Sequence, residues 1–275
     1  MPKKLFYVTT EMKPFASASP LGDVSVNVPI KLQELQHEIR TIVPKYGFIS
    51  ERKYILREVI RLREIPVQFD GEQIMTSAKS AFIPKSRVQI YFLEHQEWFK
   101  PIASLLYKSK NGRILHDNDQ RAAFFSTSVL ATFPHLFWSP DVILCNGWQS
   151  ALIPALYKQK YEGQELYKNI KTVQLIHWID DYPKFNRSAY GMVDLSIPKA
   201  LDKEIINVYS LSAEHSDAII VLNQPGSDIL KKFLKIDGIA KYKSKIATID
   251  IDYSESPDFA KLANQINDVI EKLSD

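Results

Sequence analysis

The chain alternates short, nearly continuous apolar runs with amphipathic stretches, and this alternation limits its fold more than any other feature. The runs are Lys4–Thr9, Glu38–Val43, Val88–Leu93, Asp141–Cys145, Thr172–His177, Ala218–Leu222 and Ile246–Ile251. Runs that are apolar at almost every position are typical of parallel strands covered on both faces. Since helical patterns separate them, we expect βαβ units in an α/β fold with a doubly wound, mostly parallel, Rossmann-like sheet.

Apolar residues between these runs recur at helical spacing. They are Leu21, Val24, Val28, Leu32 and Leu35, then Phe124, Val129 and Leu130, and later Ala151, Leu152, Ala155 and Leu156. Near the end, Phe259, Leu262, Ile266, Ile270 and Leu273 share one helical face. This pattern predicts a C-terminal helix over 257–273, with Ser256 as its cap and Pro257 in its first turn.

Residues 55–93 break the alternation. Asp70-Gly71 lies between two extended runs, which is a hairpin signal, so we expect a small antiparallel insertion beside the main sheet. The sequence contains no repeat, low-complexity tract or hinge linker. We therefore expect one domain over 1–275.

Composition excludes several classes of function. The net charge is +3, and the 35 basic and 32 acidic residues are interspersed, so no nucleic-acid partner is expected. No apolar segment approaches the ~20 residues that span a bilayer, and the first apolar run is too short for a signal peptide. The single cysteine, Cys145, excludes an internal disulfide and suits a reducing compartment. We expect a cytoplasmic protein without a membrane partner.

Glycine is scarce, with only 9 residues, and no two are spaced as GxG. The dinucleotide fingerprint and the phosphate-binding P-loop both need such glycines, because the backbone must approach phosphate without a Cβ in the way. No histidine pair has the helical spacing of metal ligands. We expect no cofactor and no metal site.

Eight segments carry a family likeness in their order along the chain. They read KKLFYVTTEMKPFA, LGDVSVNVPIKL, TIVPKYG, YFLEHQEWF, DNDQRAAFFS, PDVILCNGWQSALIPALY, KTVQLIH and HSDAIIVLNQP. The chain resembles the N-terminal domain of bacterial glycogen synthases and plant starch synthases, which are retaining glucosyltransferases of the GT-B type. The resemblance implies a single GT-B N-terminal lobe. In that family a C-terminal Rossmann domain holds most nucleotide-sugar contacts, and this chain ends about where that domain would begin.

The first loop departs from the family pattern. The family reads K-T-G-G-L, whose lysine meets phosphate and whose glycines expose backbone N–H groups at a helix N-terminus. Here Ser17, Ala18, Ser19, Pro20 and Leu21 hold these positions. Ser17 and Ser19 thus occupy substrate-binding positions, but proline has no N–H to offer. Ser19 followed by Pro20 predicts the N-cap and first residue of a helix, so we interpret this turn as a cap.

A second family motif, H-D-W, becomes Asn146, Gly147 and Trp148, with Gln149 following. The family's aspartate faces the substrate sugar, and its carboxylate is lost at Gly147. Gly147, Trp148 and Gln149 are candidate substrate-binding positions by resemblance only.

The third motif, T-I-H-N-L-A-Y-Q-G, becomes LIHWIDDYP. His177 is retained and is the catalytic candidate, while Trp178 replaces the asparagine and Asp181 the tyrosine. Both are further candidates for substrate binding. His177 alone, without the lysine, the aspartate and a partner domain, cannot stabilise a leaving diphosphate.

Aromatic residues offer a separate binding hypothesis. Trp98 holds the position of a family aromatic near the acceptor site. With Trp148, Trp178 and Tyr182 it could form a sugar-stacking surface at the carboxyl ends of the strands. Packing is the alternative: Trp148 as a buried helix residue and Trp98 as a partly exposed apolar side chain.

Three further groupings favour simple structural roles. Asp180 and Asp181 could suggest glycoside hydrolysis, but sequence neighbours rarely have the required separation, which favours a solvated loop. Asp117–Asp119 lack the spacing of a calcium loop and are predicted to cap the following helix. A Cys145–His177 nucleophile pair lacks an evident orienting acid, so burial of the thiol is favoured.

Three hypotheses for function remain. The first is a glycogen/starch-synthase-like protein that lacks the nucleotide-sugar domain, is inactive alone, and binds α-glucan, an oligosaccharide or a protein. The second is the active half of a two-chain glucosyltransferase that uses ADP-glucose or UDP-glucose to extend an α-1,4-glucan, a partner supplying the C-terminal domain. The third is an enzyme of unrelated chemistry, which convergent titratable groups near His177 would indicate.

Overall fold

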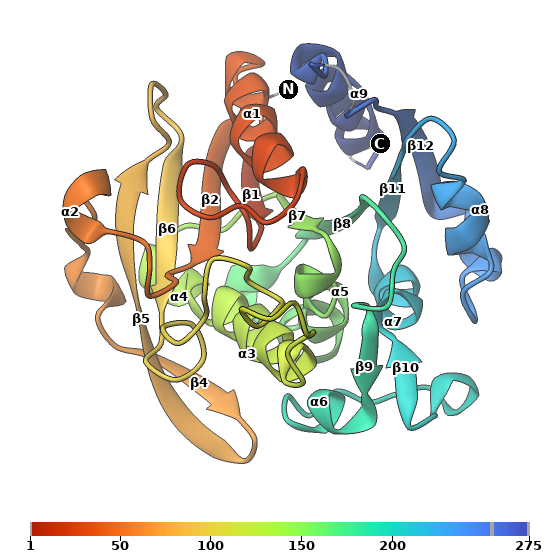
Figure 1. Ribbon diagram of the computed structural model, residues 1–275, viewed down its shortest axis with the longest axis horizontal. Coiled ribbons are helices and arrows are strands. Elements are labelled where there is room, and N and C mark those ends of the chain that lie inside the picture. Colours follow the sequence, from red (N-terminus) through yellow and green to blue (C-terminus); the bar gives the residue numbers. More distant parts are fainter. Residues whose placement is uncertain (1, 254–255, 274–275) are drawn as a thin grey trace.

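The computed structural model describes residues 2–253 and 256–273. Its strands are β1 (Lys4–Val8), β2 (Glu38–Pro44), β3 (Arg57–Glu58), β4 (Ile65–Phe69), β5 (Glu72–Phe82), β6 (Gln89–Glu94), β7 (Val142–Asn146), β8 (Lys171–Ile176), β9 (Lys184–Asn186), β10 (Ile205–Asn207), β11 (Ala218–Asn223) and β12 (Ile246–Asp250). One large sheet runs in the order β12-β11-β8-β7-β1-β2-β6-β5-β3, with β4 paired to β5 (Figure 1). The part from β12 to β6 is parallel throughout. Each predicted apolar run is one of these parallel strands, which confirms the α/β prediction.

Helices cover both faces of the sheet. They are α1 (Leu21–Glu34), α2 (Glu51–Tyr54), α3 (Asn118–Ala131), α4 (Phe133–Leu136), α5 (Ile153–Leu156), α6 (Arg187–Gly191), α7 (Val208–His215), α8 (Ile229–Leu234) and α9 (Phe259–Lys272). Helices α1 and α9, from opposite ends of the chain, lie side by side (Figure 1). Within the described ranges, no helix is both long and apolar enough to cross a membrane.

Burial on both faces of β1 explains why residues 5–8 are apolar at every position. Leu5 and Tyr7 belong to the core beneath α1 and α9, whereas Phe6 and Val8 belong to the core beneath α3 and α5. Side chains of a strand alternate between faces, so a strand covered on both sides must be apolar at successive residues.

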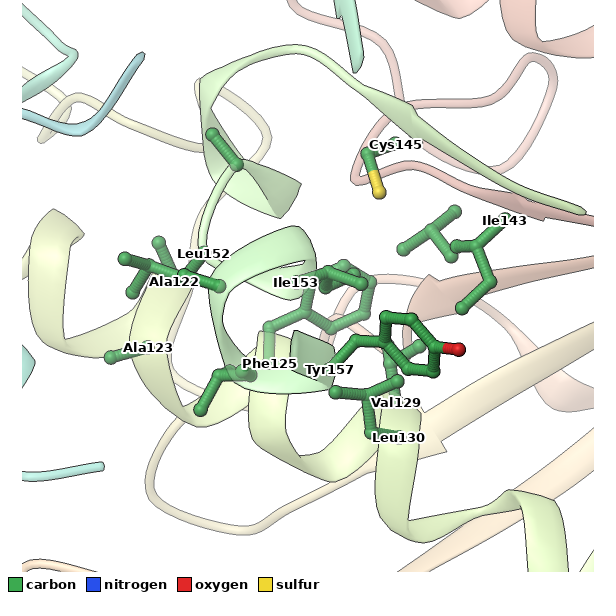
Figure 2. Packing of buried hydrophobic residues seen from close by; sticks show 14 of the residues in the cluster. Ala122, Ala123, Phe125, Val129, Leu130, Ile143, Cys145, Leu152, Ile153 and Tyr157 are labelled. Carbon is green, nitrogen blue, oxygen red and sulfur yellow. The ribbon is translucent and has the colours of Figure 1, made fainter. Parts of the chain in front are cut away.

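Cys145 of β7 lies in the core on the α3 and α5 side. Figure 2 shows its sulfur above the side chains of Ile143, Phe125 and Ile153, which come from β7, α3 and α5. Burial raises the pKa of this thiol far above its usual range, so it stays protonated. The predicted burial of Cys145 is confirmed, and a thiolate nucleophile at this position is excluded.

The hairpin predicted within residues 55–93 is present. Asp70 and Gly71 both have positive φ, at 54° and 78°, as a tight two-residue turn between β4 and β5 requires. Strand β5 then pairs antiparallel to β6, while β6 itself runs parallel to β2. The insertion therefore extends one edge of the sheet and leaves its parallel centre intact.

The centre of the sheet defines where a ligand would be expected. The chain moves outward from β1 to β2 and β6, then returns to place β7 on the other side of β1. In open α/β sheets the usual ligand position is at such a reversal, which here lies at the carboxyl ends of β1 and β7. The segments leaving these ends are Thr9–Ser19 and Gly147–Gln149, which contain several candidate residues.

The C-terminal helix begins two residues later than predicted. Helix α9 spans Phe259–Lys272, and the Asp258 side chain accepts a hydrogen bond from the Lys261 backbone N–H at 2.9 Å. The expectation that Ser256 and Pro257 form the cap and first turn is wrong. A carboxylate two residues further along fills the N-cap position and also opposes the positive end of the helix dipole.

We expect Asp258→Ala to lower the free energy of unfolding by about 1 kcal/mol, because the first turn of α9 loses its side-chain acceptor. Ser256→Ala, at the predicted but incorrect cap, should change it by less than about 0.5 kcal/mol. Urea denaturation of both variants measures the difference. Equal losses in the two variants would contradict the assignment of Asp258 as the cap.

Candidate functional site

A buried carboxylate organises the loop that follows β1. Glu11 has no solvent exposure. Its Oε2 accepts the backbone N–H groups of Ala18 and Ser19 at 2.6 and 2.8 Å, and its Oε1 accepts the Ser19 hydroxyl at 2.9 Å. The Tyr107 hydroxyl also donates to Oε1, at 3.0 Å. The anion-binding groups of this loop are therefore occupied by the protein's own carboxylate.

Burial dominates the electrostatics of this cluster. Loss of hydration raises the pKa of Glu11 despite the hydrogen bonds that favour its charged form. Burial also raises the pKa of Tyr107 well above its ordinary value. The phenol remains a neutral donor, and it shares a further hydrogen bond of 2.8 Å with the Thr10 hydroxyl.

The Ser19-Pro20 turn begins helix α1. Ser19 Oγ accepts the Leu21 N–H at 3.3 Å, and Pro20 already has helical φ and ψ of −57° and −17°. Ser17 is exposed, and its hydroxyl donates to the Ser19 carbonyl at 3.2 Å. Both serines thus serve the loop itself. The N-cap residue of α1 is Pro20, without a side-chain cap hydrogen bond, so the prediction of Ser19 as N-cap and Pro20 as first helical residue is wrong by one position.

His177 lies at the end of β8 inside a closed polar network. It has no exposure; its Nε2 is 2.5 Å from Asn146 Oδ1, and its Nδ1 is 3.3 Å from the Tyr253 hydroxyl. The Asn146 amide donates in turn to Tyr7 and to Ser25, the latter at 3.1 Å. Residues from three neighbouring strands and α1 therefore meet at the edge of the sheet where the ligand crevice was expected.

Burial lowers the pKa of His177 from 6.5 to about 3. The imidazole is therefore neutral near pH 7 and has no proton to give to a leaving group. Burial raises the pKa of Tyr7 and Tyr253 beyond the range in which they ionise. The network is satisfied and uncharged, a pattern typical of a structural polar core.

Gly147 has a backbone conformation that other residues rarely adopt, with φ of 78°. A Cβ at this position would lie 2.6 Å from Gln149 Oε1, closer than real side chains approach. Gln149 is buried, with 3% exposure. The Gln149 side chain thus fills the space into which a side chain at Gly147 would project, so the local packing favours glycine here.

Trp148 is a packing residue. It is 2% exposed, and its ring stacks on Tyr182 with centroids 5.6 Å apart and an angle of 2° between the planes. Tyr107 and Phe185 contact the same indole edge-on, at 5.2 and 5.9 Å. The ring faces that a sugar would need are covered by the protein, which supports the packing alternative.

Trp98 and Trp178 are both half-buried. Trp98 stacks on Phe124 at 5.5 Å, whereas Trp178 lies against His177 at 5.4 Å. Trp98, Trp148 and Gln149 line one small cavity, but Trp178 is not among its lining residues. The structure therefore brings together three of the predicted positions and leaves Trp178 apart from them.

The acidic candidates have local roles. Asp181 is exposed and pairs with Lys184 at 2.6 Å, while Asp180 accepts the Tyr182 N–H at 2.9 Å. Burial raises the pKa of Asp180. The solvated-loop interpretation fits Asp181, and neither carboxylate contributes to the cavity.

The predicted cap of α3 is wrong in detail. The Asp117 side chain makes no cap hydrogen bond and instead pairs with Arg121 at 2.5 Å, one turn along the helix. Asp119 turns away to accept the backbone and side-chain N–H groups of Asn186, at 2.9 and 2.7 Å. Within 2–253 and 256–273, no three His, Cys, Asp or Glu side chains are grouped to hold a metal ion.

Sequence reasoning missed Glu11 and Tyr107. Glu11 has one signal, since it is an acidic residue shortly after a buried strand, in the loop that leads into α1. Tyr107 has none, because it reaches Glu11 from 96 positions along the chain. Only the folded arrangement of the long segment before α3 brings its hydroxyl to this site.

Known proteins resemble this chain in sequence and in fold. Residues 4–225 match the family described as the starch synthase catalytic domain. The chain belongs to this family. The glycogen synthase of Pelodictyon phaeoclathratiforme is 32% identical over 242 residues, covering 87% of this chain and 48% of that protein. The glycogen synthase of Chlorobium luteolum is 35% identical over 213 residues, covering 77% and 42%.

A solved relative supports the fold. The catalytic domain of starch synthase IV from Arabidopsis thaliana, bound to ADP and acarbose, superposes with a TM-score of 0.72 at 20% identity, covering 90% of this chain and 51% of that one. The chain spans about half the length of the curated relatives it matches. The lobe is thus a glycogen-synthase-like, glycosyltransferase-fold unit of GT-B type.

We expect Glu11→Gln to lower the free energy of unfolding by about 1–3 kcal/mol, because an amide supplies one acceptor oxygen where four donors converge. Glu72→Gln, on the exposed hairpin, is the matched control and should be neutral within about 0.5 kcal/mol. Chemical denaturation measures both. A neutral effect of Glu11→Gln would show that its hydrogen bonds do not hold the loop.

His177 should make the fold sensitive to acid. Its pKa is lower in the folded chain than the ordinary 6.5, so the unfolded chain binds its proton first, and stability falls as the pH drops below 6.5 towards about 3. The maximum slope from this residue is about 1.4 kcal/mol per pH unit. Unfolding measured between about pH 7 and about pH 5 should show a shallower slope for His177→Gln than for wild type. The exposed His116→Gln is the control for the removal of one imidazole.

Proposed function

We propose that this lobe is a non-catalytic member of the starch and glycogen synthase family, which binds an α-glucan or a protein partner and does not transfer glucose by itself. One observation carries the proposal: the backbone N–H groups that would face a pyrophosphate already donate hydrogen bonds to a carboxylate of the protein. The Ala18 and Ser19 N–H groups bond to Glu11, and the next residue, Pro20, has no N–H.

The positive charge of this loop is already paired within the protein. Ser17 stands where the family has its phosphate-contacting lysine. Lys13, the nearest lysine in sequence, forms an ion pair with Asp23 at 2.7 Å. A leaving diphosphate needs preorganised donors or cations at the moment its charge develops, and this turn offers it neither.

The sugar-facing positions support the same proposal. His177 is neutral and its ring nitrogens are engaged by Asn146 and Tyr253. Gly147 lacks the carboxylate, and Gln149 fills its place. Neither the phosphate end nor the sugar end of the expected substrate would therefore meet a free charged group that stabilises the transition state. This favours a binding role over catalysis. Because these side chains are buried and hydrogen-bonded to one another, they also count against the hypothesis of an enzyme with unrelated chemistry near His177.

An α-glucan is the ligand that the family suggests, because its named members build glycogen or starch. The Arabidopsis structure was determined with acarbose. In this chain the half-buried Trp178 is the predicted aromatic that remains outside the central packed cluster, so it is our candidate for sugar contact.

A second candidate function is the active half of a two-chain glucosyltransferase. This function is supported by a comparison of lengths, because this chain covers only 48% and 42% of two glycogen synthases. A partner chain would then supply the nucleotide-sugar lobe, with ADP-glucose or UDP-glucose as donor and an α-1,4-glucan as acceptor.

Tryptophan fluorescence separates these functions. We expect a maltooligosaccharide titration to change the emission of the purified chain, and ADP-glucose at micromolar concentration to leave it unchanged. Trp178→Ala should abolish the response to the oligosaccharide. Trp138→Phe, at a buried position in the core beneath α3 and α5, is the control and should keep it.

Three results would overturn the proposal. Micromolar binding of ADP-glucose would contradict the occupied loop, and glucan elongation by the purified chain alone would contradict the absence of catalysis. Activity that appears only when a second protein is added would establish the two-chain function instead.

A further inference from the structure

The small net charge of the whole chain conceals one strongly basic segment. Residues 229–245 contain six lysines and a single acidic residue, Asp237, so this segment carries a net charge of +5. The whole chain carries +3, and the other residues together therefore carry −2. The segment consists of α8, a turn and the 3₁₀ helix η6 (Ala240–Lys245), and it lies outside residues 4–225, which match the family.

Five of the six lysines are exposed, and we call them the lysine surface. In α8 the buried residues Ile229 and Phe233 face the core, so the lysines between and beyond them point to solvent. Two turns, from the Ile236 N–H to the Phe233 carbonyl at 3.0 Å and from the Ile239 N–H to the Ile236 carbonyl at 3.1 Å, lead directly into η6. Figure 1 shows α8 at the outer edge of the molecule. The lysine surface consists of Lys231, Lys232, Lys235, Lys241 and Lys243.

The charges of the lysine surface are not neutralised within the protein. Over residues 2–253 and 256–273, none of its members lies within ion-pair distance of a carboxylate. Asp237, the acidic residue of the segment, pairs instead with Lys203 at 2.5 Å. Lys245 has a structural role, because its Nζ donates to the carbonyls of Glu214 and Ser216 at 3.1 and 2.8 Å. Like charges this close in sequence repel one another, and a bound anionic group relieves that repulsion.

An apolar pocket adjoins the end of α8. Its volume is about 280 Å³. Ile236, one of its lining residues, directly follows Lys235 of the lysine surface, and Ile205 is 56% exposed. Pockets for drug-sized ligands are usually larger, so this space suits a single apolar side chain. The apolar residues that line it are Leu201, Ile205, Ile206 and Ile236.

The composition of the lysine surface selects among anionic partners. Single-stranded nucleic acids stack on exposed aromatic rings, and membrane surfaces take up exposed apolar side chains. In the part of the chain that the structure describes, none of the exposed large apolar residues lies within 229–245. The cations are all lysines, whose ammonium groups act as point charges, whereas bidentate recognition of phosphate favours arginine. These features favour the carboxylates of a polypeptide.

We propose that the lysine surface and the adjoining pocket bind an acidic segment of a partner protein, with carboxylates on the lysines and one apolar side chain in the pocket. This inference rests on the protein-binding side of the proposed function and gives the partner its chemistry. It concerns a separate place in the fold: η6 leads into the amino end of β12, whereas His177 follows the carboxyl end of β8 in the same parallel sheet.

Fluorescence anisotropy tests the proposal on the full chain, with a labelled oligoglutamate peptide that contains one leucine as the probe. We expect binding at low ionic strength that weakens as salt is added. The double variant Lys231→Glu and Lys232→Glu should weaken binding by about tenfold, because two exposed attractions become repulsions. The control, Lys85→Glu and Lys110→Glu, makes the same charge change at two exposed lysines elsewhere and should alter binding by less than about twofold.

The pocket has its own test. Ile205→Ser should weaken binding of the leucine peptide by about threefold, because the apolar contact is lost. It should leave unchanged the binding of a peptide in which serine replaces the leucine. Ile114→Ser, at an isoleucine with 53% exposure, is the matched control and should affect neither peptide.

Several results would overturn the proposal. They are no binding of the peptide, equal losses in the two lysine variants, and equal or tighter binding of phosphatidylserine vesicles or single-stranded DNA. The Lys231→Glu and Lys232→Glu variant should keep the fluorescence response to maltooligosaccharide. The outcome at the lysine surface is thus measured separately from the proposed glucan contact at Trp178.

Discussion

The buried carboxylate of Glu11 is the interaction on which the candidate site depends. It accepts two backbone N–H groups and two hydroxyls, so it joins the end of β1 to the start of α1 and to the segment that carries Tyr107. Such a group is costly to bury unless its acceptor sites are filled. Once they are filled, the loop has few donors left for an external anion, and the functional interpretation of this lobe follows from that occupation.

The polar side chains near the carboxyl ends of β7 and β8 are also paired within the protein. Asn146, His177 and Tyr253 satisfy one another at the carboxyl ends of the central strands, and burial keeps the histidine neutral. Gln149 lies over Gly147. A site built to stabilise developing charge needs oriented donors that are free in the ground state. Here the donors and acceptors at the strand ends are engaged mainly with each other, which is the arrangement of a stable core.

Much of the fold could be predicted from the sequence because its signals are local. The parallel strands follow from apolar residues at successive positions, and the hairpin follows from Asp70-Gly71, whose positive φ values few other pairs tolerate. Boundaries set by competing polar groups were less predictable. Asp258 rather than Ser256 caps α9, and Asp117 pairs with Arg121 instead of capping α3. In both cases several polar side chains lie near the start of the helix, and the residue pattern does not show which of them forms a given hydrogen bond.

The sequence by itself determined the α/β class, the family, and which residues stand in the loop after β1 and in the turn after β7, since these depend on residue identity at fixed positions along the chain. Only the tertiary structure decided which contacts these residues make. Glu11 meets Tyr107 across 96 positions, and Trp148 is covered by Tyr182, because the sheet order and the long loop bring them together. Contacts between residues far apart in sequence depend on topology and packing, and these carry no local signature.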